Sequence, residues 1–375
     1  MVRRYSILFL LMLALGACGA GGATYSPVPT IVTPASNSIP ATTNTPTAAV
    51  ATLTVMTHDS FSMSEAVLQA FESANNVKVT ILKAGDAGGM LNQAILSKAA
   101  PLADVLYGVD NTFLSRALNA DIFEPYAAPA LTPISTTYKL DPSNRLLPVD
   151  VGYVTINYDR AALPTAGITL PTTLRDLTKP AWKGKLVVEN PAISSPGLAF
   201  LLTTITTFGE SGDYTWRNFW RDLRANDALV SADWSDAYYT RFSGSSGKGP
   251  YPLVVSYSTS PAAEVFFSAG KLSEPPTANL NIPGSSFQQI EFVGILKGTK
   301  QRTLAERFVD FMLEPTFQND MPLQMFVYPV NPSAQVPTIF QQFAQTPPQP
   351  ATLLPSQIEQ QREAWLDEWT KIMLR

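Results

Sequence analysis

The stretch 185–202, KLVVENPAISSPGLAFLL, places a strand directly before a helix, and this pair of elements decides the fold class. KLVVEN (185–190) is rich in β-branched residues and predicts a strand. The residues SSPG (194–197) then precede a run of apolar helix formers. Serine is a preferred N-cap and proline suits the first helical turn, so we expect a helix to begin at Ser195. The positive end of its dipole would face whatever lies beyond the strand.

The same alternation of strand and helix occurs near the start of the folded part. TLTVMT (52–57), VKVTIL (77–82) and ADVLYG (103–108) predict strands, and each precedes a segment with apolar residues at helical spacing. Alternation of this kind predicts an open, mostly parallel α/β sheet. Ligands of such sheets bind beyond the carboxyl ends of the strands. Two candidate binding loops lie there: His58-Asp59-Ser60 and Asp110-Asn111.

A second α/β region begins near residue 146 and repeats the arrangement. YPLVVSYSTSPAAEVFFSAG (251–270) predicts an apolar strand, a loop rich in hydroxyl groups, and a helix starting at Pro261. The chain beyond about residue 52 is longer than one ordinary domain, so we expect two lobes. We assign residues 52–148, with part of about 260–300, to lobe 1. Residues 149–259, with about 301–375, form the expected lobe 2.

The first 51 residues predict export and anchoring rather than a folded domain. Residues 1–17 have two arginines before an apolar run, which is the layout of a secretory signal. They lead to LGAC, which resembles the lipobox of bacterial lipoproteins, and Cys18 is the only cysteine of the chain. Residues 18–51 lack charge and are rich in Gly, Thr, Pro and Ala, as is typical of a disordered tether. We expect Cys18 to be lipidated and to hold the protein on the outer side of the cell membrane, in the cell envelope or periplasm.

Composition argues against several function classes. The chain carries 26 Lys and Arg against 30 Asp and Glu, with no basic run, so nucleic-acid binding is not expected. His58 is the only histidine, and a His-Asp-Ser string along a strand does not form a catalytic triad, because neighbouring side chains point to opposite faces. The chain has no HExxH motif and no cysteine cluster, so we expect no metal, no cofactor and no catalytic site.

Aromatic and hydroxyl side chains are instead frequent in the predicted loops. Trp234 lies in ADWSDAYY, Tyr257 in VVSYSTSP and Tyr328 in MFVYPV. Each of them alone would fit a protein core equally well. An aromatic face attracts cations and stacks on flat rings. With a carboxylate at Asp110 and a helix start at Ser195, the set could hold a flat cationic ligand, including one that bears phosphate.

Eight segments occur in one order from about residue 52 to the end of the chain: HDSF, ADVLYGVDNT, ISSPGLAFLL, DWSDAY, VVSYSTSP, FMLEPTFQNDMP, VYPV and QREAWLDEW. Together they resemble the thiamine-binding proteins of bacterial ABC transporters. The resemblance implies a type II periplasmic-binding fold, with two lobes of open mixed sheets flanked by helices and the ligand in the cleft between them. It also implies a monomeric, non-enzymatic receptor that delivers thiamine, or a thiamine phosphate, to a permease and its ATPase subunit.

The resemblance also implies the ligand-binding residues. The motifs place them at Asp110, Asn111, Ser194, Ser195, Trp234, Ser256, Tyr257, Ser258 and Thr259, joined by His58, Asp59, Phe326 and Tyr328. The chain departs from the family at His58, where relatives have tyrosine, and at Phe326, where they have tryptophan. A further tryptophan, shortly after HDSF, is absent. The thinner aromatic cage leaves the affinity and the preferred form of thiamine open.

Three alternatives stay open at this point. Tyr238 and Tyr239 resemble the adjacent tyrosine pair of ferric-ion receptors, which share the fold, and hard oxygen donors suit iron. A polyamine receptor of the same fold is a second alternative. A surface-anchored hydrolase is the alternative from another class.

Overall fold

The computed structural model describes residues 50–375, except 166, 168 and 246–248. The predicted signal peptide, Cys18 and nearly all of the predicted tether lie outside these residues. The described part forms one sheet with the order β2-β1-β3-β10-β5-β8-β6-β7, to which β4, β9 and β11 add short pairings.

Two groups of parallel strands make up the outer parts of this sheet. The first consists of β1 (Ala51–Thr57), β2 (Val77–Lys83) and β3 (Val105–Asp110), with β1 in the middle. The second consists of β6 (Leu186–Glu189), β7 (Leu229–Ser231) and β8 (Leu253–Tyr257), with β6 in the middle. The strands predicted at 52–57, 77–82, 103–108 and 185–190 are therefore present.

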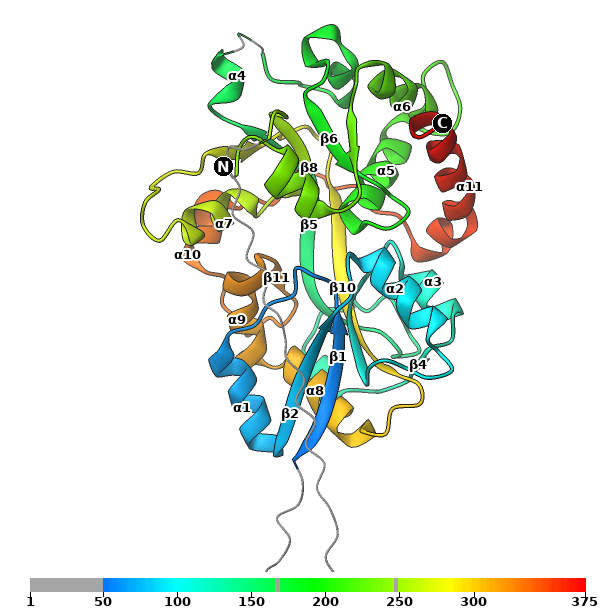
Figure 1. The fold of residues 1–375 in the computed structure, drawn as a ribbon, viewed down its shortest axis with the longest axis vertical. Coiled ribbons are helices and arrows are strands. Elements are labelled where there is room, and N and C mark those ends of the chain that lie inside the picture. Colours follow the sequence, from blue (N-terminus) through cyan, green and yellow to red (C-terminus); the bar gives the residue numbers. More distant parts are fainter. Residues whose placement is uncertain (1–49, 166, 168, 246–248) are drawn as a thin grey trace, which may run out of the picture. The chain divides into compact units, whose positions relative to one another are not determined.

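Two long strands join the groups. β5 (Leu147–Asp159) and β10 (Phe287–Leu296) pair with each other, and Figure 1 shows both passing from one group to the other. β10 runs antiparallel to β3, and β5 runs antiparallel to β8. The alternation of elements predicted a mostly parallel sheet, and these two strands make it mixed, as the family resemblance implied. The short strands β4 (Phe123–Glu124), β9 (Thr277–Asn279) and β11 (Tyr328–Pro329) pair with β10 or β5.

Helices cover the sheet around both groups. They are α1 (Glu65–Asn75), α2 (Ala87–Leu96), α3 (Leu114–Asn119), α4 (Ala162–Thr165), α5 (Ser195–Phe208), α6 (Trp216–Ala225), α7 (Ser260–Phe267), α8 (Arg302–Leu313), α9 (Pro315–Met325), α10 (Thr338–Phe343) and α11 (Pro355–Met373). In the described part of the chain, no helix combines the length and the apolar character that crossing a bilayer requires.

The helix starts follow from local chemistry. α5 begins at Ser195, as predicted, and its residues from Ser195 to Ile205 are buried, which explains why GLAFLL is apolar on every face. The indole of Trp220 on α6 meets Trp369 on α11 edge to face at 5.6 Å, so the C-terminal helix packs onto the same core. α7 begins at Ser260, one residue before the predicted start, with Pro261 in its first turn.

Candidate functional site

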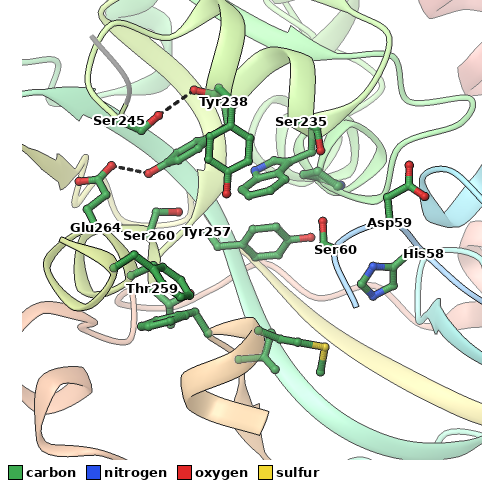
Figure 2. A pocket seen from close by; sticks show the side chains of 18 of the residues that line it. His58, Asp59, Ser60, Ser235, Tyr238, Ser245, Tyr257, Thr259, Ser260 and Glu264 are labelled. Carbon is green, nitrogen blue, oxygen red and sulfur yellow. Dashed lines mark hydrogen bonds between the residues drawn. The ribbon is translucent and has the colours of Figure 1, made fainter. Parts of the chain in front are cut away.

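A cavity of about 580 Å³ lies where the two strand groups meet. Its lining comes from the loop after β1, the start of α2, the start of α5, the segment after β7, the β8–α7 junction, β10, and the end of α9. Figure 2 shows Tyr257 inside it, with Glu264 and Ser260 on one side and His58, Asp59 and Ser60 on the other. Most of these segments follow a strand or begin a helix, which is where the ligands of α/β sheets bind.

Seven of the thirteen predicted site residues line this cavity. They are His58, Asp59, Ser195, Trp234, Tyr257, Thr259 and Phe326. The other six lie outside its described lining: Asp110, Asn111, Ser194, Ser256, Ser258 and Tyr328.

Aromatic rings form one wall of the cavity. The indole of Trp234 stacks on Tyr238 with ring centroids 5.1 Å apart and planes 15° apart, and Tyr257 meets its edge at 6.2 Å. Trp234 Nε1 donates a hydrogen bond to Ser256 Oγ at 2.9 Å. Ser256 is thus buried behind the indole and fixes its plane. The wall presents the aromatic surface that a flat cation would require.

Tyr257 connects two elements of the wall. Its hydroxyl donates to Gln289 Oε1 at 3.2 Å, which links β8 to β10. The next residue, Ser258, is fully buried, and its backbone N–H donates to the carbonyl of Tyr153 at 2.8 Å. The VVSYSTSP loop therefore divides its residues between the cavity and the supporting structure.

Asp110 lies buried at the end of β3. Its Oδ2 accepts a hydrogen bond from the hydroxyl of Ser195, and its Oδ1 accepts one from the backbone N–H of Thr112 at 2.7 Å. Burial raises the pKa of Asp110 to about 6, although both donors act to lower it. Asp110 thus holds the cavity-lining Ser195 in place from behind.

Asn111 has a comparable supporting position. Its side-chain amide donates to the carbonyl of Gln288 at 3.1 Å and accepts from the backbone N–H of Ile290 at 2.9 Å. It therefore ties the end of β3 to β10. Tyr328, also outside the lining, donates its hydroxyl to the carbonyl of Ala344.

Phe326 closes one side of the cavity with an unusual backbone. It is the C-cap of α9 and adopts the left-handed conformation, with φ at 57°. Its ring stacks on Phe340 of α10 at 5.5 Å and contacts Phe266 and Phe267 of α7. An aromatic cluster thus surrounds Phe326.

Three acidic residues of the lining were missed in the sequence: Asp86, Glu264 and Glu291. Asp86 is the N-cap of α2, and its Oδ1 accepts from the N–H of Ala87 at 2.9 Å. Burial raises the pKa of Asp86, and neighbouring donors offset only part of this effect. Glu291 reaches the cavity from β10, and its Oε1 lies 3.5 Å from Nε2 of His58.

A buried acidic cluster lies directly behind Glu291. The hydroxyl of Tyr107 donates to Asp150 Oδ2 at 2.6 Å and to Glu291 Oε2 at 3.0 Å. Asp150 and Glu291 are opposite each other on β5 and β10. Burial, followed by the charge of Glu291, raises the pKa of Asp150 well above its ordinary value. Asp150 therefore keeps its proton more readily than an ordinary carboxyl group does.

A further acidic residue lies on the other side of Tyr257. Glu264 accepts hydrogen bonds from the hydroxyl of Tyr238 and, at 2.6 Å, from that of Thr277. Within the described residues, no lysine or arginine lines the cavity, and no group of three or more His, Cys, Asp and Glu side chains is arranged to hold a metal ion. The described lining thus combines aromatic rings with the carboxyl groups of Asp59, Asp86, Glu264 and Glu291.

Comparisons with known proteins identify the family of the chain. A family model described as "Bacterial extracellular solute-binding protein" matches residues 100–348. The thiamine-binding periplasmic protein of Salmonella typhimurium is 31% identical over 331 residues, covering 86% of this chain and 94% of its own. The thiamine-binding periplasmic protein of Escherichia coli is 29% identical over 332 residues, with the same coverage.

The solved structure most useful for comparison is a periplasmic thiamin-binding protein. It has a TM-score of 0.75 and 28% identity, and the match covers 86% of this chain and 96% of that one. It confirms the expected α/β fold of the type II periplasmic binding proteins, with a mixed sheet flanked by helices. The relatives are solute-binding proteins, as expected, and not enzymes. The chain therefore belongs to the family of bacterial extracellular solute-binding proteins, and thiamine-binding periplasmic proteins are among its relatives.

Proposed function

We propose that this protein is the receptor of an ABC importer that captures thiamine outside the cytoplasm and delivers it to a permease driven by an ATPase. One observation carries the proposal: the cavity combines an aromatic wall at Trp234 with several carboxyl groups, and its described lining contains no lysine or arginine. Thiamine has a thiazolium ring with a permanent positive charge and a flat aminopyrimidine ring. Stacking and cation–π attraction suit the rings, and carboxylates suit both the charge and the amino group.

The site residues fall into two roles in this proposal. Those that line the cavity contact the ligand: His58, Asp59, Ser195, Trp234, Tyr257, Thr259 and Phe326. The other six lie outside the lining and are proposed to support it: Asp110, Asn111, Ser194, Ser256, Ser258 and Tyr328. Among them, Asp110 holds Ser195 and Ser256 holds Trp234. Ser195, at the start of α5, is the proposed contact for the hydroxyethyl end of thiamine. Asp86 and Glu291 join the first group as acidic contacts.

Thiamine phosphates are the weaker candidates. Carboxyl groups lie on both sides of Tyr257, with Glu264 on one side and Asp59 on the other. Glu291, 3.5 Å from His58, adds a further carboxyl group to the lining. A phosphate at either end of the ligand would approach one of these groups. The N–H groups at the starts of α5 and α7 favour an anion and offset part of that repulsion. We therefore place thiamine ahead of its phosphate esters.

The anchoring proposal rests on the sequence alone. We propose that residues 1–17 are removed, that Cys18 is lipidated, and that residues 18–51 tether a monomeric receptor to the membrane. We also propose the lobe boundaries expected from the sequence, near residues 148 and 259.

The ferric-ion alternative depends on Tyr238 and Tyr239. Ferric ions bind phenolate oxygens, which require an ionised tyrosine. Burial, followed by the charge of Glu264, raises the pKa of Tyr238 well above its ordinary value of 10, and the hydroxyl already donates to that carboxylate. This environment disfavours the phenolate. A polyamine would benefit from the carboxyl groups but would leave the stacking surface of Trp234 unused.

A thermal-shift screen tests the proposal. The purified protein is heated with thiamine, thiamine monophosphate, thiamine diphosphate, ferric citrate or spermidine. A ligand present at 100 times its Kd stabilises the folded state by about 2.7 kcal/mol, so Tm should rise clearly with thiamine and by less with its phosphates. A rise with ferric citrate or spermidine and none with thiamine would contradict the proposal.

A further inference from the structure

His58 is a cavity side chain with a buried nitrogen that has no hydrogen-bond partner among the described residues. The residue is 9% exposed, and this nitrogen is Nε2. The nearest acidic atom is Glu291 Oε1 at 3.5 Å, which is an electrostatic contact rather than a hydrogen bond. A buried nitrogen left unpaired costs free energy unless another group pairs with it. The Nε2 atom of His58 can therefore gain a partner or change its protonation state when a ligand binds.

Two neighbouring residues fix the position of the His58 imidazole before a ligand binds. Gly108, with φ at +105°, lies against the ring, and a Cβ at that residue would lie 2.3 Å from Cδ2 of His58. Any larger residue would displace the imidazole. On another side, Tyr107 contacts the ring with centroids 5.6 Å apart. The glycine and the tyrosine together fix where His58 sits in the cavity.

The charged groups that act most strongly on His58 are acidic, while the nearby Lys83 of β2 donates through Nζ to the carbonyl of Asp59 at 2.8 Å. Glu291 faces it from β10, Asp86 from the start of α2, and Asp59 from the next position in the chain. Tyr107, on β3, lies against the ring and connects to Asp150 on β5. Burial acts to lower the pKa of His58, but Glu291, Asp86 and Asp59 together raise it by more, so the net pKa lies above the ordinary value of 6.5.

We propose that His58 carries a proton in the empty cavity and releases it when thiamine binds, so that the fixed charge of the thiazolium replaces the charge of the imidazolium opposite Glu291. The inference rests on the proposed function. The only bond that breaks is the N–H bond of the imidazolium, and the proton passes to solvent. The carboxylates of the cavity then face one positive charge in both states, the imidazolium before binding and the thiazolium after it. The local charge around them therefore changes little.

The exchange makes His58 a specificity-determining residue. A permanently cationic ligand gives Glu291 and Asp86 a positive neighbour once the imidazolium has lost its proton, whereas a neutral ligand of the same shape drives no proton release and leaves the imidazolium in place. Linkage is reciprocal: if protonation of His58 weakens thiamine binding by some factor, thiamine lowers the pKa of His58 by the logarithm of that factor. The pH dependence of the Kd for thiamine and the number of protons released on binding are therefore two measurements of the same coupling between His58 and thiamine.

The chain allows a direct test, because His58 is its only histidine. Proton NMR of the imidazole Hε1 in the intact protein follows one signal through a pH titration, without and with saturating thiamine. We expect thiamine to move the midpoint to lower pH. Calorimetry at pH 6.5–8, in two buffers with different ionisation enthalpies, should show release of up to about one proton. Below the midpoint of the free protein, the affinity should fall by up to about tenfold per pH unit.

Two variants identify the source of the proton. In His58→Gln the calorimetric proton release and the pH dependence of Kd at pH 6.5–8 should largely disappear. Glu291→Gln should lower the His58 midpoint in the free protein and reduce proton release. Equal proton release by wild type and His58→Gln would assign it to the carboxyl groups and overturn the inference.

The NMR experiment needs no variant and decides the question on its own. An unchanged His58 midpoint in thiamine-saturated wild type would also overturn the inference, even if thiamine binds tightly. Absence of thiamine binding to wild type would instead refute the proposed function, so the two failures are distinguishable.

Discussion

The hydroxyl of Ser195 donates a hydrogen bond to the buried carboxyl group of Asp110, although the two residues are 85 positions apart in the chain. Ser195 begins α5, beside the second strand group, and Asp110 ends β3 in the first. Ser195 lines the cavity and Asp110 does not. The pair therefore connects the two groups of strands directly beneath the proposed ligand.

Asp110→Asn should change how stability depends on pH. The pKa of Asp110 rises from an ordinary 3.8 to about 6 in the folded protein, mainly through burial. The folded state thus keeps a proton that the unfolded chain loses, and the stability that this provides is complete below pH 4 and is lost as the pH rises through about 6. The loss is at most about 3 kcal/mol. Urea unfolding should show wild type losing more stability than the variant between pH 4 and 7.

Parallel pH profiles of the two proteins would show that Asp110 does not titrate as inferred. Ser195→Ala provides the complementary measurement, because it removes a donor that stabilises the charged carboxylate. That variant should raise the pKa of Asp110 further and should also weaken thiamine binding through loss of a lining hydroxyl.

Gly88 and Gly89 of α2 offer a matched pair. The backbone N–H of Gly88 donates to the carbonyl of Ile193 at 3.0 Å, and a Cβ at Gly88 would lie 2.7 Å from that oxygen. A Cβ at Gly89 would have nothing within 4 Å. Alanine should stabilise α2 by about 1 kcal/mol at Gly89, but at Gly88 it should push the helix away from the Ile193 loop. We expect Gly88→Ala to weaken thiamine binding by several-fold and Gly89→Ala to leave it unchanged.

Calorimetry gives Kd for both variants, and urea unfolding separates binding from stability. If Gly88→Ala bound thiamine as tightly as Gly89→Ala, the contact between α2 and Ile193 would not belong to the ligand-bound arrangement.

Local patterns in the sequence predicted the elements better than their arrangement. The β-branched runs, and the Ser-Pro start of α5, depend on nearby residues and could be identified directly. The directions of β5 and β10 could not, because an apolar run buried on both faces looks the same in parallel and antiparallel pairing. The mixed sheet was therefore implied by the family resemblance and not by the alternation of strands and helices.

The sequence also did not indicate that Asp86 and Glu291 line the cavity. Asp86 precedes a helix, where capping alone explains an aspartate, so nothing in the sequence marked it as a lining residue. Glu291 is one of three polar residues of β10, and it reaches His58 because β10 pairs with β3 across a long separation in the chain. Trp234 and similar aromatic residues could be predicted as site residues because they lie among polar residues in loops.

Cys18→Ala should release the protein from membranes. Cys18 is the only cysteine and follows a predicted signal, so its loss removes the proposed site of lipid attachment. One acyl chain alone gives only marginal attachment, which suggests that more than one chain is present on the cysteine. Fractionation of cells by ultracentrifugation should find wild type in the membrane pellet and the variant in the supernatant. Recovery of the variant in washed membranes would contradict lipid anchoring through Cys18.

Trp234→Ala should weaken thiamine binding by about tenfold or more. The indole is proposed to stack on the ligand and to attract its cation, which is worth about 0.5–2 kcal/mol, and about 1.4 kcal/mol corresponds to tenfold in Kd. Its loss also removes the ring that stacks on Tyr238 at 5.1 Å and the donor to Ser256. Trp234→Phe keeps a ring in place and should therefore lose less affinity than the alanine variant.

Tryptophan fluorescence separates a contact from a structural role. Thiamine should quench the emission of wild type and quench Trp234→Phe less, because the remaining tryptophans include the fully buried Trp216, Trp220 and Trp369. Circular dichroism and Tm of the free variants control for unfolding. If folded Trp234→Ala bound thiamine with the wild-type Kd in calorimetry, the aromatic wall would not be the ligand-binding surface, and the proposed binding mode would have to be abandoned.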